Sequence, residues 1–212
     1  MGGLHVNSQS SEHQRVPAWD DRLHLTGYDF FISVDVETAG SEPESYSLLS
    51  IGACVAFCPE QTFYVELQPA SLAARPEALA VSGLSMERLA IDGLPPKLAM
   101  ERFAEWIRSV TPVDCRPVFV AFNAPFDWMF VNVYFHRYLG ENPFGHSALD
   151  LKALYMGLTG APWSETSMPY VASRYSGGRQ LTHNALADAR DQAELLRGML
   201  EEARAHGWSW LS

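Results

Sequence analysis

The chain has 212 residues and a formal net charge of −10 at pH 7, because 15 lysine and arginine residues face 25 aspartate and glutamate residues. Its 47% hydrophobic and 12% aromatic residues can build a buried core, which excludes a disordered chain, and the length favours one α/β domain over two. The acidic balance argues against a broad basic face for duplex nucleic acid but leaves room for a local groove.

We expect the sequence to carry neither a secretory signal nor a disulfide framework. No apolar run reaches the length of a membrane span, and the polar N-terminus lacks the apolar stretch of a secretory signal. Cys54, Cys58 and Cys115 are too few for a disulfide scaffold, and no nearby partner pair supports a zinc site. We therefore expect buried thiols, a cytoplasmic location and no membrane partner.

The sequence divides into a domain and two tails. Residues 1–25 show no periodicity and are expected to form a flexible tail, residues 26–206 the folded domain, and residues 207–212 a C-terminal tail.

The first half of the domain has the pattern of strands. Apolar and polar residues alternate from Tyr28 to Glu37, which predicts a strand. Two more strands are predicted over 48–57 and 62–67, with a short turn at Pro59 between them. Consecutive strands with short links usually form an antiparallel meander.

The second half is mainly helical. Helices are predicted from Pro76 to near Gly83, over 97–110, from the N-cap Asn123 to about Leu139, over 149–157 and over 184–205; one strand is predicted over 117–122 and no element over 161–181. The helix after Asn123 is apolar almost all round, so we expect it to be sandwiched in the core. Together the elements predict a mixed α/β domain.

Two carboxylates stand together at the end of the first strand. Asp35 and Glu37 are two residues apart and so share one face, with Cα atoms about 6–7 Å apart. Adjacent anions at a buried strand end repel each other unless a cation such as Mg²⁺ or Mn²⁺ lies between them. A solvated strand end is the alternative interpretation of so short a motif.

Two further aspartates lie near helix starts. Asp127 is in a first helical turn, where acids suit the helix dipole, but its neighbours are apolar and a carboxylate among them needs a partner. Asp188 lies on the same helical stripe as Leu195 and Met199, which turns it toward the core. Buried carboxylates are normally paired or metal-bound.

His183 precedes Asp188 by five residues. On one helix these side chains would point about 140° apart, so they can share a site only if His183 stands on the preceding loop. Imidazole titrates near neutral pH, which suits proton transfer, although a lone histidine is more often structural.

These motifs, taken in order, resemble a known family. Asp35-x-Glu37-Thr38, Asn123-x-x-x-Asp127 and His183-x-Ala185-x-x-Asp188-Ala189 are similar to the three motifs of the DnaQ-like, DEDDh 3′–5′ exonucleases, which include RNase T, oligoribonuclease and the polymerase III proofreading subunit. The resemblance covers roughly residues 28–200 and extends to Ser50-Ile51-Gly52, Val81-Ser82-Gly83-Leu84 and Asp188-Ala189-x-x-Gln192-Ala193. Phe122 and Ser82 depart from it, since the family often has histidine at both positions.

The resemblance implies a ribonuclease H-like fold, with a mixed sheet of an antiparallel three-strand meander plus parallel strands, flanked by helices. It also implies two divalent metal ions, Mg²⁺ or Mn²⁺. Asp35, Glu37 and Asp188 would hold the first ion. Asp35 and Asp127, partly through water, would hold the second, and His183 would be the general base. Thr38 and Phe126 are candidate substrate contacts. Asn184 stands where another subclass has tyrosine, which favours the histidine subclass.

The implied activity is metal-dependent 3′–5′ hydrolysis of single-stranded nucleic acid, releasing nucleoside 5′-monophosphates. The partner is then a 3′ end of DNA or RNA, between which the sequence does not choose, and a homodimer stays open. Arg174 and Arg179 flank a glycine pair and either meet phosphates or belong to a solvated loop. The alternative function is a catalytically idle module of the same fold that binds nucleic acid or a protein.

Overall fold

The computed structural model describes residues 28–179 and 182–208. The tail predicted at residues 1–25 lies outside this range, as do residues 209–212 of the predicted C-terminal tail. Trp208, at the start of that second tail, packs against the core around the last helix. Across the described ranges, no helix combines the length and the apolar character needed to cross a bilayer.

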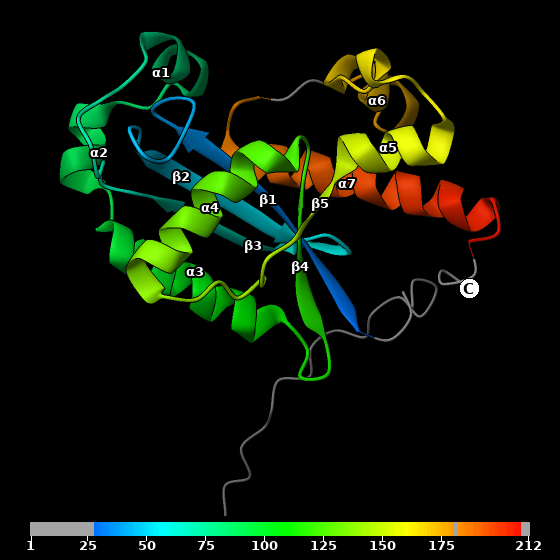
Figure 1. Ribbon diagram of the computed structural model, residues 1–212, viewed down its shortest axis with the longest axis horizontal. Helices are drawn as coiled ribbons and strands as arrows, with labels where there is room; N and C mark the ends of the chain where they lie inside the picture. The colour runs from blue at the N-terminus through cyan, green and yellow to red at the C-terminus, as the bar shows by residue number, and fades with distance from the viewer. Residues whose placement is uncertain (1–27, 180–181, 209–212) are drawn as a thin grey trace, which may run out of the picture.

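A mixed sheet of five strands forms the centre of the domain (Figure 1). Its strands are β1 (Asp29–Thr38), β2 (Leu48–Val55), β3 (Cys58–Glu66), β4 (Arg116–Ala121) and β5 (Ala148–Asp150), in the spatial order β3-β2-β1-β4-β5. The first three strands form an antiparallel meander, and β4 and β5 run parallel to β1. This arrangement confirms the predicted sheet.

Seven α-helices are described around the sheet. They are α1 (Pro76–Ser82), α2 (Met86–Asp92), α3 (Pro96–Val110), α4 (Ala124–Leu139), α5 (Leu151–Thr159), α6 (Met168–Tyr175) and α7 (Ala185–Ala205), with a 3₁₀ turn, η2 (Trp163–Glu165), between α5 and α6. The predicted helices near residues 76, 97, 123 and 184 are confirmed to within one or two residues.

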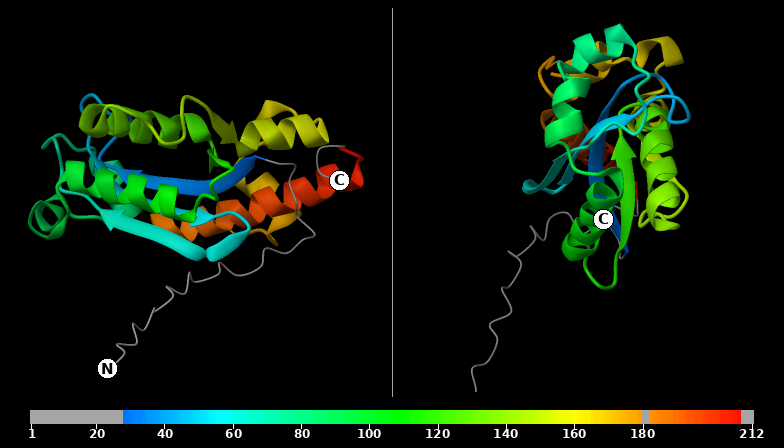
Figure 2. Two further views of the ribbon diagram at one scale, coloured as in Figure 1. Left: turned by 90° about the horizontal axis from the view of Figure 1, so that it is seen from below. Right: turned by 90° about the vertical axis from the view of Figure 1, so that its left-hand side faces the viewer.

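The alternation along β1 sends its side chains into two cores. Phe30, Ile32 and Val34 pack on the face covered by α3 and α4. Phe31 packs on the opposite face, with residues of α5, α6 and α7. Figure 2 shows helices on both sides of the sheet. Because side chains alternate along a strand, Asp35 and Glu37 share the α7 face with Phe31. The last helix therefore lies over the side of the sheet that carries both acids.

Gly52 allows α7 to lie this close to the sheet. It pairs with Asp35 in the β1–β2 register. A Cβ atom at residue 52 would lie 2.1 Å from the carbonyl carbon of Ala185 and 2.2 Å from the nitrogen of Leu186, both in the first turn of α7. Only glycine fits so near a backbone, and this close approach brings the start of α7 over the end of β1.

The predicted turn between β2 and β3 is misplaced. The turn lies at residues 56–57, and Pro59 is inside β3. Because β3 is at the edge of the sheet, a proline there costs no interior ladder bond. Cys54 and Cys58 consequently lie on different strands, and burial raises the pKa of the Cys54 thiol to about 12, as expected of an inert buried cysteine.

The sequence did not predict three short elements, and it overestimated the burial of one helix, α4. The three, namely α2, α6 and β5, are each eight residues or shorter. Periodicity needs a longer window, so these elements depend on their tertiary neighbours. The prediction that α4 is sandwiched in the core is wrong, because Trp128, Met129 and Val133 are only half-buried and His136 is exposed.

Candidate active site

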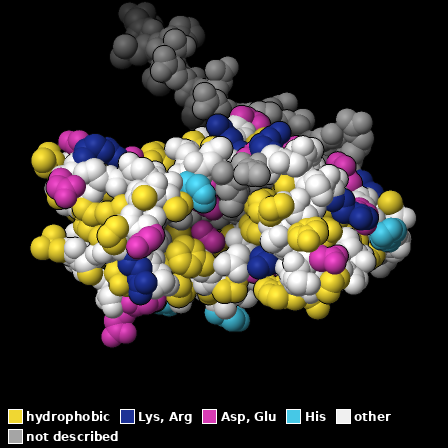
Figure 3. Space-filling view, turned by 90° about the horizontal axis from the view of Figure 1, so that it is seen from above, with side chains coloured by type: hydrophobic (Ala, Val, Ile, Leu, Met, Phe, Trp, Pro, Cys, Tyr) yellow, Lys and Arg dark blue, Asp and Glu magenta, His cyan; other side chains and the backbone are white. Residues whose placement is uncertain are grey.

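A cleft of about 540 Å³ opens where β1 ends, between α1, α4 and α7. It is lined by all seven residues that the sequence marked for the site, namely Asp35, Glu37, Thr38, Phe126, Asp127, His183 and Asp188. Figure 3 looks onto this side of the molecule, where acidic side chains and a histidine surround a hollow between two largely hydrophobic shoulders. The fold thus brings together residues up to 153 positions apart, from Asp35 to Asp188.

The two acids of β1 face α7 in a largely apolar setting. The side chain of Asp35 is only 9% exposed, and that of Glu37 is half-buried. Burial raises the pKa of Asp35 well above its usual value, and the charges of Asp127, Glu37 and Asp188 raise it further. Burial and the charge of Asp188 raise the pKa of Glu37 to about 8. The site concentrates negative charge that its own side chains do not neutralise.

Asp127 reaches the end of β1 from the first turn of α4. It is 4% exposed, and its Oδ1 atom accepts a hydrogen bond of 3.0 Å from the backbone N–H of Val36. Burial raises the pKa of Asp127 to about 8 although this hydrogen bond lowers it. One carboxylate oxygen is therefore tied to the strand that carries Asp35 and Glu37.

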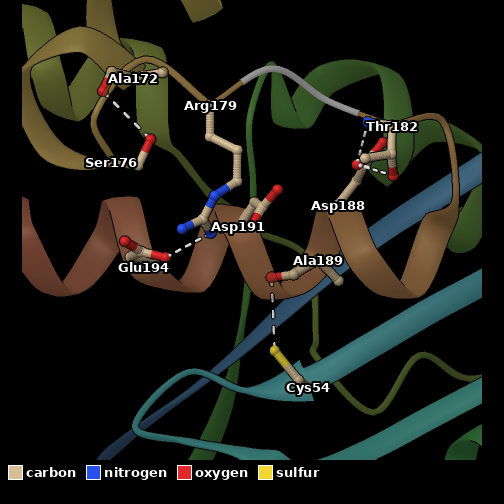
Figure 4. A network of polar contacts seen from close by, with 9 residues as sticks. All are labelled: Cys54, Ala172, Ser176, Arg179, Thr182, Asp188, Ala189, Asp191 and Glu194. Atoms are coloured by element: carbon tan, nitrogen blue, oxygen red, sulfur yellow. Dashed lines mark hydrogen bonds and ion pairs between the residues drawn. The ribbon is translucent and has the colours of Figure 1, made fainter.

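Asp188, 1% exposed at the start of α7, holds the loop before it in place (Figure 4). Its Oδ1 atom accepts hydrogen bonds from the backbone N–H and the hydroxyl of Thr182, at 2.7 and 2.9 Å. Its Oδ2 atom accepts one of 2.8 Å from the N–H of His183. Asn184 caps the helix by accepting from the N–H of Ala187. His183 therefore stands on the loop, as its shared site with Asp188 requires.

Two residues of the cleft hold an unusual backbone conformation. Asn123 and His183, with φ values of 66° and 57°, are the non-glycine residues with positive φ in the described chain, and both line the cleft. Such left-handed residues gather at functional sites, where the surrounding structure holds them. The predicted capping role of the Asn123 side chain is wrong: the residue precedes α4, but its side chain caps nothing.

The donor set fits a divalent cation. One ligand atom from each of Glu37, His183 and Asp188 lies within 4.8 Å of the others. Within the described ranges, no lysine or arginine forms an ion pair with Asp35, Glu37, Asp127 or Asp188. Carboxylate oxygens are the ligands that Mg²⁺ and Mn²⁺ prefer. A group of acids without a basic partner is therefore suited to bind such an ion.

Gln192 belongs to this site, although sequence analysis gave it no role. It is fully buried on α7, and its Nε2 donates a hydrogen bond of 2.6 Å to Oδ1 of Asp35. Its Oε1 accepts one of 2.9 Å from the N–H of Phe122 at the end of β4. Because that N–H can only donate, it fixes the orientation of the amide. The signal available in the sequence was a polar residue one turn after Asp188 on the inward stripe.

Replacing Gln192 with leucine should weaken metal binding and also destabilise the fold. The change frees Asp35 to turn and leaves the N–H of Phe122 without its acceptor, at a cost of about 1–3 kcal/mol in stability. Groups that orient ligands typically contribute about 10- to 100-fold to metal affinity or activity. Calorimetric Mn²⁺ titration and thermal melts would measure both, with Glu201→Leu on the exposed face of α7 as the matched control. Unchanged Mn²⁺ affinity would contradict this role.

The other residues that the sequence suggested as substrate contacts all interact with neighbouring residues of the protein. The hydroxyl of Thr38 donates to the carbonyl of Gly40 at 2.7 Å, and the ring of Phe126 lies 5.5 Å from that of Phe130. Arg174 pairs with Glu202 on α7. Arg179 pairs with Asp191 and Glu194 along the same helix (Figure 4). Both arginines are thus engaged with carboxylates of the same helix.

Comparison of the sequence with known proteins identifies related exonucleases. The RNase T exonuclease model matches residues 32–196. The 3′–5′ DNA exonuclease Cap18 of Escherichia coli is 52% identical over 172 residues, which cover 81% of this chain and 92% of that protein. Ribonuclease T of Histophilus somni (strain 129Pt) is 28% identical over 189 residues, covering 84% of this chain and 86% of that enzyme.

Solved structures share the fold at low sequence identity. The nuclease domain of 3′hExo, a DEDDh family member solved with rAMP, has a TM-score of 0.68 at 15% identity, covering 82% of this chain and 93% of that one. E. coli exonuclease I with a dT13 oligonucleotide has a TM-score of 0.63 at 18% identity, covering 84% and 43%. These structures confirm the ribonuclease H-like fold. Since the family model spans most of the chain, the protein belongs to the RNase T exonuclease family, within the DnaQ-like DEDDh group, and is a hydrolytic exonuclease.

Proposed function

We propose that this protein is a metal-dependent 3′–5′ exonuclease that removes nucleoside 5′-monophosphates from the 3′ ends of single-stranded DNA. The observation that carries the proposal is the meeting of four carboxylates and one imidazole in a single cleft, supplied by β1, α4, α7 and the loop before α7. The idle-module alternative gives no reason to keep so many mutually repelling acids in one buried place. We assign the catalytic domain to residues 26–206.

One comparison favours DNA as the substrate, and the charge of the chain favours a single strand end. The relative with 52% identity is a DNA exonuclease, whereas the ribonuclease T relative is 28% identical. A chain with a net charge of −10 is also poorly suited to coat a long duplex, which favours gripping one strand end at the cleft. Ribonuclease activity is the alternative, and the same assay tests it.

Asp35, Glu37, Asp127 and Asp188 would hold two divalent ions. Such ions stabilise the negative charge that develops on the attacking, phosphoryl and leaving oxygens during hydrolysis of a phosphodiester. Three of the four carboxylates are held by hydrogen bonds from the protein itself. Gln192 donates to one oxygen of Asp35, and the N–H of Val36 donates to one oxygen of Asp127. Asp188 accepts hydrogen bonds from Thr182 and His183.

His183 would act as the general base. It is exposed at the mouth of the cleft, and its backbone N–H is tied to Asp188. The imidazole takes a proton from the attacking water, whose oxygen forms a bond to phosphorus. The bond from phosphorus to the 3′ oxygen of the preceding nucleotide breaks, and that oxygen takes up a proton from solvent while the imidazolium returns its proton to solvent. The products are a nucleoside 5′-monophosphate and a strand that is one nucleotide shorter.

A labelled-strand assay tests the proposal. Single-stranded DNA carrying a 5′ label, the RNA of the same sequence and a circular single-stranded DNA are incubated with Mg²⁺ or Mn²⁺, and then with EDTA. We expect a ladder that shortens from the 3′ end of the linear DNA, nucleoside 5′-monophosphates as products, intact circles, and no cleavage in EDTA. An Asp35→Asn protein purified in the same way controls for contaminating nucleases.

Three outcomes would count against parts of this function. Circles degraded as fast as linear strands would indicate an endonuclease. Faster loss of the RNA would move the substrate to the ribonuclease alternative. Cleavage that persists in EDTA would remove the metal ions from the mechanism.

A further inference from the structure

Arg75 lines the cleft and carries a positive charge, but the proposed mechanism assigns it no role. It precedes α1 and is exposed, and it lines the same cleft as Asp35 and Asp188. Its backbone N–H donates a hydrogen bond of 2.8 Å to the carbonyl of Ala39, directly after β1. The segment that carries Arg75 is therefore tied to the end of the strand that carries the acids.

The loop after β1 builds a support for this arginine. The N–H of Ala39 donates to the carbonyl of Ser47 at 2.8 Å, and the hydroxyl of Thr38 donates to the carbonyl of Gly40 at 2.7 Å. The ring of Tyr46 lies against the backbone of Gly40 so closely that a Cβ atom at residue 40 would be 2.3 Å from the ring. Glycine at this position thus lets the tyrosine lie flat over the loop.

Tyr46 holds the guanidinium by one edge. Nε of Arg75 donates a hydrogen bond of 3.2 Å to the Tyr46 hydroxyl, and the guanidinium carbon lies 5.5 Å from the centre of the ring. No carboxylate of the described chain forms an ion pair with Arg75, in contrast to Arg88, which pairs with Glu66 at 2.7 Å. The two terminal nitrogens, which form the fork that recognises phosphate, are left for another acceptor.

The guanidinium lies beside the acid cluster and not within it. Among the described residues, Arg75 forms no ion pair with Asp35, Glu37, Asp127 or Asp188, and its guanidinium is held at Tyr46 on the loop after β1. Arg75 therefore lines the α1 side of the cleft, and a bound strand carries one phosphate for every nucleotide.

We propose that Arg75, held on Tyr46, binds a backbone phosphate of the substrate strand other than the one that is cleaved. This inference rests on the proposed function, because it requires a strand in the cleft. The arginine fork then serves as a second point of grip that holds the strand in register while its terminal phosphodiester lies at the acids.

Two substrates separate this role from a role in the chemical step. A single-stranded oligonucleotide has phosphates beyond the scissile one, whereas the 4-nitrophenyl ester of thymidine 5′-monophosphate has one phosphodiester and no other phosphate. Arg75→Ala should raise KM for the oligonucleotide by about ten- to a hundred-fold, the range for one charge-assisted contact. Turnover of the nitrophenyl ester should stay within about two-fold of the parent protein, on the expectation that its single phosphodiester occupies the reacting centre.

Salt dependence and graded variants sharpen the test. Loss of one phosphate contact should reduce the slope of log affinity against log salt by about 0.7 for a single strand, measured in Ca²⁺ to prevent cleavage. Arg75→Lys keeps the charge without the fork and should lie between Arg75→Ala and the parent. Tyr46→Phe keeps the ring but removes the anchoring hydroxyl, and it should raise KM by a smaller factor. Arg102→Ala, on the exposed face of α3, is the matched control.

The outcomes are distinct. If the parent protein cleaves neither substrate, the proposed function has failed. If the parent cleaves both and Arg75→Ala has an unchanged KM and salt slope for the oligonucleotide, the inference on Arg75 is overturned. An equal loss on both substrates would overturn it as well, because the arginine would then serve the scissile phosphate. Thermal melts of each variant show whether a loss reflects unfolding.

Discussion

Replacing His183 with alanine should lower turnover on single-stranded DNA by about two to four orders of magnitude, the usual contribution of a general base. The imidazole stands at the mouth of the cleft on a loop that Asp188 fixes through the His183 N–H. Binding of Mn²⁺ should change much less, because hard cations prefer the carboxylate oxygens nearby. Single-turnover cleavage and calorimetric Mn²⁺ titration measure the two effects separately.

The backbone at residue 183 calls for a second variant. Its φ of 57° is unfavourable for alanine but is tolerated by asparagine, so His183→Asn removes the imidazole without the strain. Asp188→Ala is the contrasting change, since it removes a carboxylate and also releases the loop that holds Thr182 and His183. We expect Asp188→Ala to lose both metal binding and turnover.

Glu37, His183 and Asp188 have ligand atoms within 4.8 Å of one another, so this comparison also decides between two roles of the histidine. A His183→Asn protein that loses Mn²⁺ as fully as Asp188→Ala would make His183 a metal ligand. A His183→Asn protein that cleaves like the parent would remove it from catalysis.

Without metal, the protein should become less stable as the pH rises from about 4 to about 8. Folding raises the pKa of Glu37 from 4.5 to about 8 and that of Asp127 from 3.8 to about 8. Between the unfolded and folded pKa values the native state binds more protons than the unfolded state, so the free energy of unfolding falls with pH. The stabilisation is complete below the unfolded values and is lost as the pH passes the folded ones.

Metal binding should reverse this loss. At a concentration of 100 times its Kd, a ligand specific to the native state adds about 2.7 kcal/mol per site. In a chain of this size, each kcal/mol raises Tm by about 2–4 °C. Thermal melts in EDTA and in excess Mn²⁺, each at pH 5, 6.5 and 8, provide the measurement, and we expect the gap between the two series to widen with pH.

The variant Asp35→Asn serves as the control for the melts. It removes one of the charges that repel in the cleft, so it should flatten the pH dependence in EDTA and reduce the gain from Mn²⁺. A Tm that Mn²⁺ leaves unchanged at pH 8 would contradict a metal site formed by these acids.

The sequence by itself determined those features that depend on short-range pattern. Alternation in β1 and the inward stripe of α7 were both readable, because each covers enough residues to show its period. The same patterns placed Asp35 and Glu37 on one face and turned Asp188 toward the core. The family motifs added Asp127 and His183, and the structure lines one cleft with all five.

Only the tertiary structure decided which neighbouring residues hold these side chains in position. The hydrogen bond from Gln192 to Asp35 joins residues 157 positions apart, and the one from Val36 to Asp127 joins residues 91 apart. The close approach of α7 to Gly52 and the support of Arg75 by Tyr46 likewise join separate elements. Such pairings leave no periodic trace in a single sequence, because they arise from how helices pack on the sheet and not from local preference.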